Sequence, residues 1–240
     1  MVTCATSNGA KTDFQPFPRT GRLKKALDLN LPTLRKRLTR ETGDVHPYVV
    51  ATIHYENDRF SQTGSGPNFQ GGFITLCTCK HRMRSSHTSD EWPGRWVAGF
   101  TGVGAVDRGN YLVYLMKVGE AFASHLDLWS SAKLPWKTKR AKAAHLRRLG
   151  DMFQPRSPAS NPYDYRSYVA PRSDHSHFHN GQWHKDIDYG STRPAALLVG
   201  DPEFSYLWDR PLLRLPDQLS RNPSGRSIHE LLEQLEFMNS

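Results

Sequence analysis

The chain has 240 residues, and its 32 Lys and Arg residues against 23 Asp and Glu residues give a formal net charge of +9. With 37% hydrophobic residues, it has enough apolar surface for a buried core, which argues against wholesale disorder. The positive charge favours a polyanionic partner, and we expect nucleic acid, DNA more than RNA, or a nucleotide. No stretch reaches the roughly 20 apolar residues of a membrane span, and the N-terminus has no apolar core of the signal-peptide kind. We therefore expect a cytoplasmic protein without a membrane partner.

Residues 1–45 form a basic N-terminal extension that we expect to be partly helical. Leucines recur in it at helical spacing, at Leu27, Leu31, Leu34 and Leu38. Pro32 interrupts this pattern, which predicts two short helices or one broken helix. Two interpretations remain open, because such an arm either grips phosphate or is a solvated helix face.

Runs of β-branched and aromatic residues predict the strands of a central domain over residues 46–215. The segments that we expect to be strands are residues 48–53, 73–79, 96–100, 111–118, 195–200 and 204–208. Residues 107–110 have the composition of a turn, so the third and fourth segments should pair as an antiparallel hairpin.

Two helices are expected in the C-terminal half of the chain. Residues 137–149 are rich in Lys and Arg and predict a basic helix. Residues 216–240 contain an amphipathic helix that begins at Ser227 and has Glu230 three residues further on, the pattern of a capping box. Its apolar stripe packs either on the domain or on a partner protein.

The sequence lacks the familiar catalytic motifs. It has no phosphate-binding loop, no third glycine of a dinucleotide fingerprint, no nucleophile elbow and no Cys-X-X-Cys pair. These absences disfavour the common enzyme classes, and we assign no cofactor and no metal site. The three cysteines argue against a disulfide framework.

Cys77 and Cys79 lie two residues apart, so on a strand both side chains would point to one face. They are either small buried core residues or, for Cys79, a reactive thiolate. The second interpretation depends on Lys80 and Arg82, because nearby cations lower the pKa of a thiol. A zinc site would need His81 or distant ligands to complete its coordination.

Two further clusters carry charge. Lys80, Arg82 and Arg84 alternate, so on an extended segment they would form one positive patch that binds phosphate or is a solvated strand end. A second cluster between residues 174 and 188 holds a metal, performs acid–base catalysis or is an ordinary polar loop. Its members are Asp174, His175, His177, His179, His184, Asp186 and Asp188.

Six segments carry a family resemblance, and they are residues 72–80, 96–102, 112–118, 183–187, 198–202 and 204–208. In this order they resemble the nucleotide-modification-associated domain proteins of phages and bacteria. The resemblance extends over roughly residues 48–215 and leaves out the basic extension and the C-terminal helix. It implies a place in a DNA-base hypermodification pathway more than a particular reaction.

The strand pattern of residues 96–120 is also similar to the PUA-like group, which includes the ASCH and EVE modules. This similarity implies a small barrel that holds a base, often a modified one, between its strands. We therefore expect an α+β fold with a mostly antiparallel, partly closed PUA-like β-barrel and peripheral helices.

Two functions follow from these observations. As a binding module, the protein would recognise a modified base or nucleotide in a barrel pocket. Phosphate would be held by Lys80, Arg82 and Arg84, the base would be lined by Phe69, Trp96 and Tyr114, and its edges would be hydrogen-bonded by Asn68 and Thr101. As an enzyme, the protein would transfer a group to a base or remove one from it, with an acid–base residue and a thiol nucleophile. The candidates for these roles are His179, His184 and Asp186 for acid–base work and Cys79 for the nucleophile.

Overall fold

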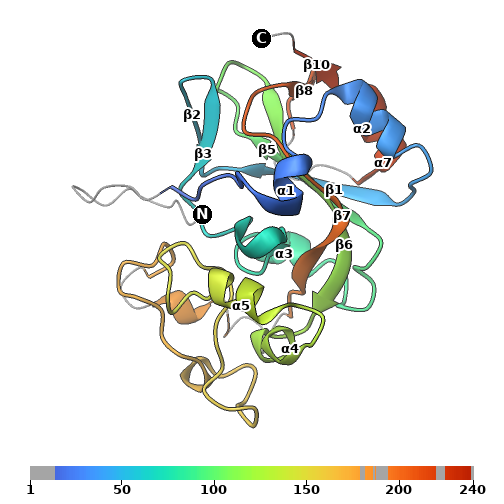
Figure 1. Ribbon diagram of the computed structural model, residues 1–240. Coiled ribbons are helices and arrows are strands. Elements are labelled where there is room, and N and C mark those ends of the chain that lie inside the picture. Colours follow the sequence, from blue (N-terminus) through green and yellow to red (C-terminus); the bar gives the residue numbers. More distant parts are fainter. Residues whose placement is uncertain (1–13, 179–181, 186, 188–193, 220–224, 239–240) are drawn as a thin grey trace.

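The computed structural model describes residues 14–178, 182–185, 187, 194–219 and 225–238. It has an α+β architecture in which a mixed sheet of eight strands lies above a region of short helices and long connections (Figure 1). We call residues 123–187 the loop half of the molecule, and the strands with the helices that cover them the sheet half.

The eight strands follow the order β10-β8-β6-β5-β1-β9, and β7 pairs with both β6 and β4. Their bounds are β1 Asp44–Val50, β4 Thr75–Leu76, β5 Trp96–Thr101, β6 Asn110–Phe122, β7 Leu197–Leu207, β8 Leu213–Leu215, β9 Arg226–Ser227 and β10 Glu236–Phe237. Only β1 and β5 run parallel, and the other pairings are antiparallel. A separate hairpin consists of β2, Ile53–Glu56, and β3, Arg59–Gln62.

The helices are short. The α-helices whose bounds lie within the described residues are α1 Gly21–Lys25, α2 Leu31–Arg37, α3 His81–Arg84, α4 His125–Ser130, α5 Trp136–Lys142 and α7 Ile228–Gln234. Single 3-10 turns are η1 Gln70–Gly72, η2 Tyr165–Ser167 and η3 Gln182–His184.

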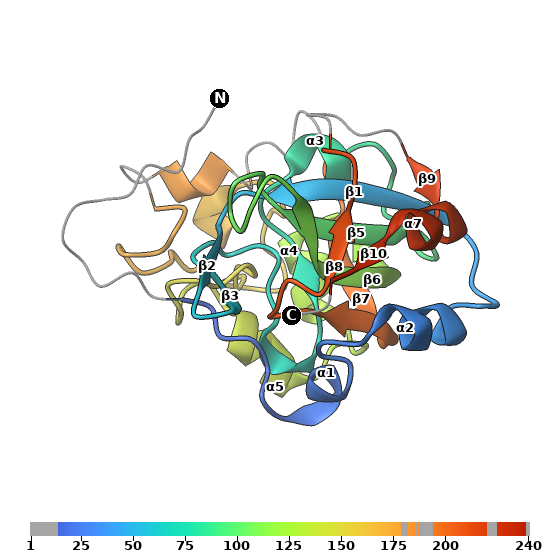
Figure 2. The same cartoon turned by 90° about the horizontal axis from the view of Figure 1, so that it is seen from above.

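The α2 and α7 helices cover one face of the sheet, and Figure 2 shows both on the same side of the molecule. The leucines of both helices pack against Trp96 and Phe100 of β5. Arg35 joins the helices directly, since its Nη2 donates to the carbonyl oxygen of Leu232 at 2.8 Å. The apolar stripe of the C-terminal helix is therefore covered by the sheet of its own chain.

Several local predictions are confirmed. The third and fourth predicted strands are β5 and β6, which pair antiparallel. The basic extension forms two short helices, and Pro32 lies in the first turn of α2, where a missing N–H costs no helical hydrogen bond. Ser227 and Glu230 form the expected capping box at the start of α7.

The described strands do not close into a barrel, so the PUA-like closure is not supported, and β10 and β9 end the strand order. The predicted strand over residues 73–79 was also too long, because β4 contains only Thr75 and Leu76. Gly71 and Gly72 before it, and Cys79 and Lys80 after it, have positive φ angles that turn the chain out of the sheet.

The two predicted strands near the end of the domain are one continuous strand, β7. Its register with β6 changes from Ser205 opposite Met116 to Gly200 opposite Val118. Residues 201–204 therefore bulge from the ladder, and Pro202 lies where no ladder hydrogen bond is required.

A buried lysine and a buried aspartate of the loop half form hydrogen bonds to the sheet half. Lys142 Nζ donates to Asn68 O at 2.8 Å, to Asn68 Oδ1 at 3.0 Å and to Phe73 O at 2.9 Å. Asp151 Oδ2 accepts from Thr75 Oγ1 at 2.8 Å. These contacts fix the loop half beside the chain that enters and leaves β4.

Candidate functional site

Cys79 lies in the sharp turn between β4 and α3. Its φ is 62° and that of Lys80 is 49°, which places two successive non-glycine residues in the left-handed region. Such conformations cost about 1–3 kcal/mol each and tend to occur at functional sites. Cys77 is buried in an apolar cluster whereas Cys79 is half-buried, so the prediction that both share a strand face was wrong.

The side chain of His177, in the loop half, contacts this turn. Its Nε2 lies 3.3 Å from Cys79 Sγ and 3.0 Å from Ser65 Oγ. Ser65 is buried, and its Oγ lies 3.1 Å from Thr78 Oγ1. The Cys79–His177 pair therefore combines a thiol and an imidazole within reach of proton transfer, beside a hydroxyl that contacts the same nitrogen.

The backbone before His177 is held by His175, which is buried. His175 Nδ1 accepts from the backbone N–H of His177 at 3.2 Å, so the proton of a neutral His175 lies on Nε2. That nitrogen lies 2.8 Å from the carbonyl oxygen of Gly150 and donates to it. His175 is thus a positioning residue for the segment that carries His177.

Cationic side chains lie close to the Cys79–His177 pair. Arg84 is buried, and its Nε donates to the carbonyl oxygen of Cys79 itself at 2.9 Å. Although the side chain of Lys80 reaches solvent, partial desolvation lowers its pKa, while the charge of the Cys79 thiolate raises it. Burial, Tyr114 and the Cys79 thiolate all raise the pKa of Tyr48. Positive charge near a cysteine favours its thiolate form, which is the nucleophile.

The three aromatic residues that were expected to line a base pocket are buried in the core. Trp96 and Tyr114 are 0% exposed and Phe69 is 1% exposed. Trp96 Nε1 donates to Thr42 O at 3.0 Å, and Tyr114 Oη donates to Tyr48 Oη at 2.8 Å. A base stacks on an exposed ring face, and these rings pack against protein instead.

The two residues that were expected to hydrogen-bond base edges form their hydrogen bonds within the protein instead. Asn68 Nδ2 donates to Leu149 O at 2.9 Å, and its Oδ1 accepts from Gln70 N at 3.0 Å as well as from Lys142. Thr101 Oγ1 accepts from Tyr111 N at 3.0 Å. Both side chains stabilise turns and strand ends.

The expected alternation of the three basic residues after Cys79 does not occur, because residues 81–84 form the α3 helix rather than a strand. Lys80 and Arg82 are exposed. Arg84 is buried and donates to the carbonyl oxygens of Ala195 at 3.1 Å and Ala196 at 2.7 Å, in addition to that of Cys79. Arg84 thus holds backbone together, and the predicted patch is smaller by one residue.

Of the remaining acid–base candidates, His184 is the one within the described residues. His184 is half-buried in η3, and its ring centroid lies 4.6 Å from that of Tyr165. His179 and Asp186 lie outside the described residues. The sequence did not single out His177 as a catalytic residue, although the alternation of histidines at 175, 177 and 179 drew attention to its segment.

A second feature is a basic groove of about 790 Å³ between residues 14–16, the α5 helix and residues 146–149. Its lining residues in the described part of the chain include no Asp or Glu. The basic side chains that line it are Lys137, Arg140, Arg147, Arg148 and Arg172. Arg172 Nη2 also pairs with Asp174 Oδ2 at 2.9 Å, and Arg148 Nε donates to Asp174 O at 2.8 Å.

Within the described residues, no group of three or more His, Cys, Asp or Glu side chains is arranged to hold a metal ion. The same residues include no helix that is long and apolar enough to cross a membrane.

The fold and site define an α+β protein with a thiol–imidazole pair at the junction of its two halves and a basic groove nearby. The family model described as nucleotide modification associated domain 2 matches residues 44–224, and the chain belongs to this family. Membership places the protein in a nucleotide modification system. No curated protein and no solved structure matches the chain.

Proposed function

We propose that this protein is an enzyme that transfers an acyl group to a base in a nucleotide modification system, with Cys79 as nucleophile and His177 as general base. The observation that carries the proposal is the 3.3 Å contact between Cys79 Sγ and His177 Nε2. A nucleophile and a base within hydrogen-bond reach, with neighbouring groups that orient the base, are the signature of covalent catalysis.

The reaction has two steps. His177 Nε2 takes the thiol proton, and the sulfur electron pair bonds to the carbonyl carbon of an activated acyl donor. The bond from that carbon to its leaving group breaks, and the imidazolium gives its proton to the leaving group. An amino group of the acceptor nucleobase then attacks the thioester. The carbon–sulfur bond breaks, and the amine proton passes through His177 to the departing Cys79 thiolate.

An acyl group is proposed because the enzyme must release its intermediate. A thioester carbon stays electrophilic and reacts with an amine, whereas the carbon–sulfur bond of a simple alkyl thioether does not break under the same conditions. Lys80 contributes positive charge that favours the thiolate, and Ser65 orients the imidazole through its contact with Nε2.

Recognition of a modified base in a barrel pocket is not part of the proposal. The rings of Phe69, Trp96 and Tyr114, which that function requires, are buried among core side chains. Nucleic acid remains the expected substrate class.

Thiol reactivity tests the proposal without knowledge of the donor. Purified protein is treated with iodoacetamide over a range of pH, and the alkylated cysteine is located by peptide mass spectrometry. Cys79 should react at neutral pH roughly 10-fold or more faster than an ordinary thiol. In His177→Ala protein the rate profile should move to higher pH, and His184→Ala is the matched control that leaves it in place. Buried Cys77 serves as an internal reference.

A generic acyl donor then tests group transfer. Incubation with p-nitrophenyl acetate should leave an acetyl group on Cys79, and addition of DNA should yield acetylated nucleosides that are lost in Cys79→Ser protein. Acetylation of lysines only, or a Cys79 rate that does not depend on His177, contradicts the proposal.

A further inference from the structure

The basic groove has no role in the proposed chemistry. The cations of α5 are divided between a face that packs on the protein and a face that lines the groove. The inner face of this helix uses its cations to hold the fold, since Lys139 Nζ donates to Trp129 O and Ser131 O, and Lys142 is buried. Lys137 and Arg140 are exposed on the groove instead. The groove therefore presents charge that the fold does not require.

Large apolar side chains line the same groove. Trp136 at the start of α5 is 57% exposed, and Phe14 on the facing segment is 49% exposed. Arg140 places its guanidinium 5.8 Å from the centroid of the Trp136 ring. Exposed aromatic rings among basic side chains are the combination that binds bases and phosphates together.

The exposed rings also distinguish between forms of nucleic acid. In a duplex the faces of the bases are covered by their neighbours, so a protein ring stacks only on bases that have left the duplex. A groove that used phosphates alone would not need Trp136 or Phe14 to be exposed.

We propose that the basic groove binds single-stranded nucleic acid, with phosphates held by Lys137, Arg140 and Arg147 and bases stacked on Trp136 and Phe14. This inference goes beyond the proposed acyl transfer, because it assigns single-stranded nucleic acid to a groove whose residues take no part in that reaction. It does not depend on the reactivity of Cys79.

Fluorescence anisotropy of the full chain with a labelled single-stranded DNA oligonucleotide, and with the duplex of the same sequence, tests the inference. The single strand should bind more tightly than the duplex. Trp136→Ala should weaken single-strand binding by roughly 5- to 160-fold, the range expected for the loss of one stacked base. Arg140→Ala should reduce the slope of log affinity against log salt by about 0.7, as expected for one lost phosphate contact.

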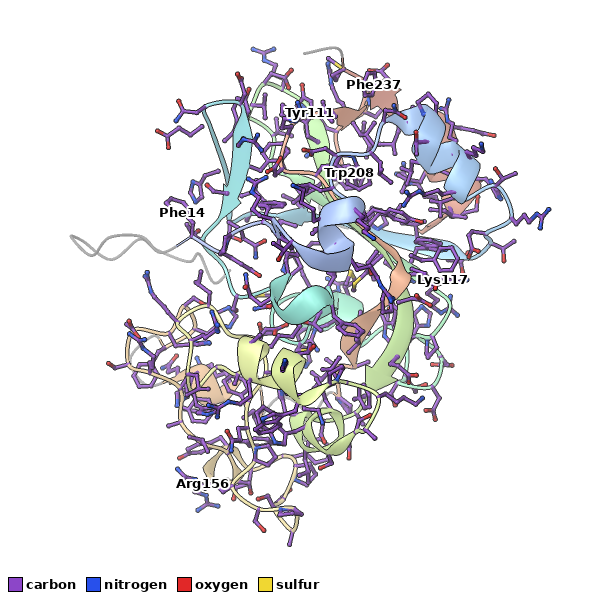
Figure 3. All side chains as sticks on the ribbon, in the orientation of Figure 1. Phe14, Tyr111, Lys117, Arg156, Trp208 and Phe237 are labelled. Carbon is purple, nitrogen blue, oxygen red and sulfur yellow. The ribbon has the colours of Figure 1, made fainter. Side chains whose placement is uncertain are left out.

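Arg156→Ala is the matched control, because Arg156 is exposed on the loop half but does not line the groove (Figure 3). This variant should bind with unchanged affinity. Circular dichroism and thermal melting show whether each variant is folded. Equal or tighter binding of the duplex, or single-strand binding that is indifferent to Trp136→Ala, overturns the inference, and neither result bears on thiol chemistry.

Discussion

The sheet half and the loop half both bury aromatic rings, but they differ in the exposure of particular tryptophan residues and in where reactive side chains lie. In the sheet half, Trp96 and Tyr114 are fully buried, and Trp208, which Figure 3 labels, is buried in the same way. In the loop half, Trp136 and the cations beside it are exposed, and His177 reaches out to a thiol of the other half. The sheet thus acts as a scaffold, and the chemistry lies where loops are fixed against it.

The largest effect should come from the buried lysine that fastens the two halves. Lys142→Met removes three hydrogen bonds and leaves Asp151 buried without its cation, which should lower the free energy of unfolding by about 3–5 kcal/mol. Urea unfolding measures it, and Lys137→Met on the exposed face of α5 is the control. A loss similar to that of the control would mean that the halves are held together in another way.

Removal of a buried hydroxyl in the sheet half should lower stability without changing nucleic-acid binding. Tyr114→Phe deletes the hydrogen bond to Tyr48 and should cost about 1–2 kcal/mol of stability. Because the ring is buried, oligonucleotide affinity should not change. Weaker binding in this variant, measured by anisotropy on folded protein, would restore the base-pocket hypothesis for this residue.

A pH effect of similar size should arise at His46 of the sheet half. Burial, with His87 and Arg95 nearby, lowers its pKa from 6.5 to about 4. Because the unfolded chain takes up the proton first, stability is lost as pH falls from about 6.5 to about 4. With allowance for partial solvent exposure, the loss is about 1–2 kcal/mol. Thermal melts of His46→Gln should show a flatter dependence over this interval, while an unchanged slope would assign it to other groups.

The smallest effect on stability should come from the groove itself. Trp136→Ala removes an exposed ring and should change the free energy of unfolding by no more than about 0.5 kcal/mol. The same variant is expected to lose oligonucleotide affinity. The two measurements together distinguish a residue that binds nucleic acid from one that stabilises the fold. A large loss of stability would show that the Trp129–Trp136 contact, with centroids 5.5 Å apart, supports the fold.

Local patterns predicted local structure well. The β5–β6 hairpin and the capping box at Ser227 depend on residues that are near one another in the chain, and both are confirmed. The extent of β4 was not predictable, because the left-handed turn after it uses Cys79 and Lys80 rather than glycine. The same turn converted an expected row of basic residues into a helix with a buried Arg84.

The site was only partly predictable for a different reason. Cys79 was suspected from its basic neighbours, but His177 lies 98 residues away, and no spacing rule connects them. The burial of Trp96 was not predictable either, because a tryptophan in a strand is compatible with a pocket wall as well as with a core. Contacts at long sequence separation decided both outcomes.

The segment of residues 172–178 has a consequence for how the two sites respond to each other. It carries Arg172 at the groove and His177 at the thiol, and Ser176 N donates to the carbonyl oxygen of Arg148 at 3.0 Å. The groove and the thiol therefore share one short piece of backbone, through which binding at one site can couple to binding at the other. Thermodynamic linkage requires such a coupling free energy to be the same in both directions, so an oligonucleotide that strengthens adduct formation is itself held more tightly by the modified protein.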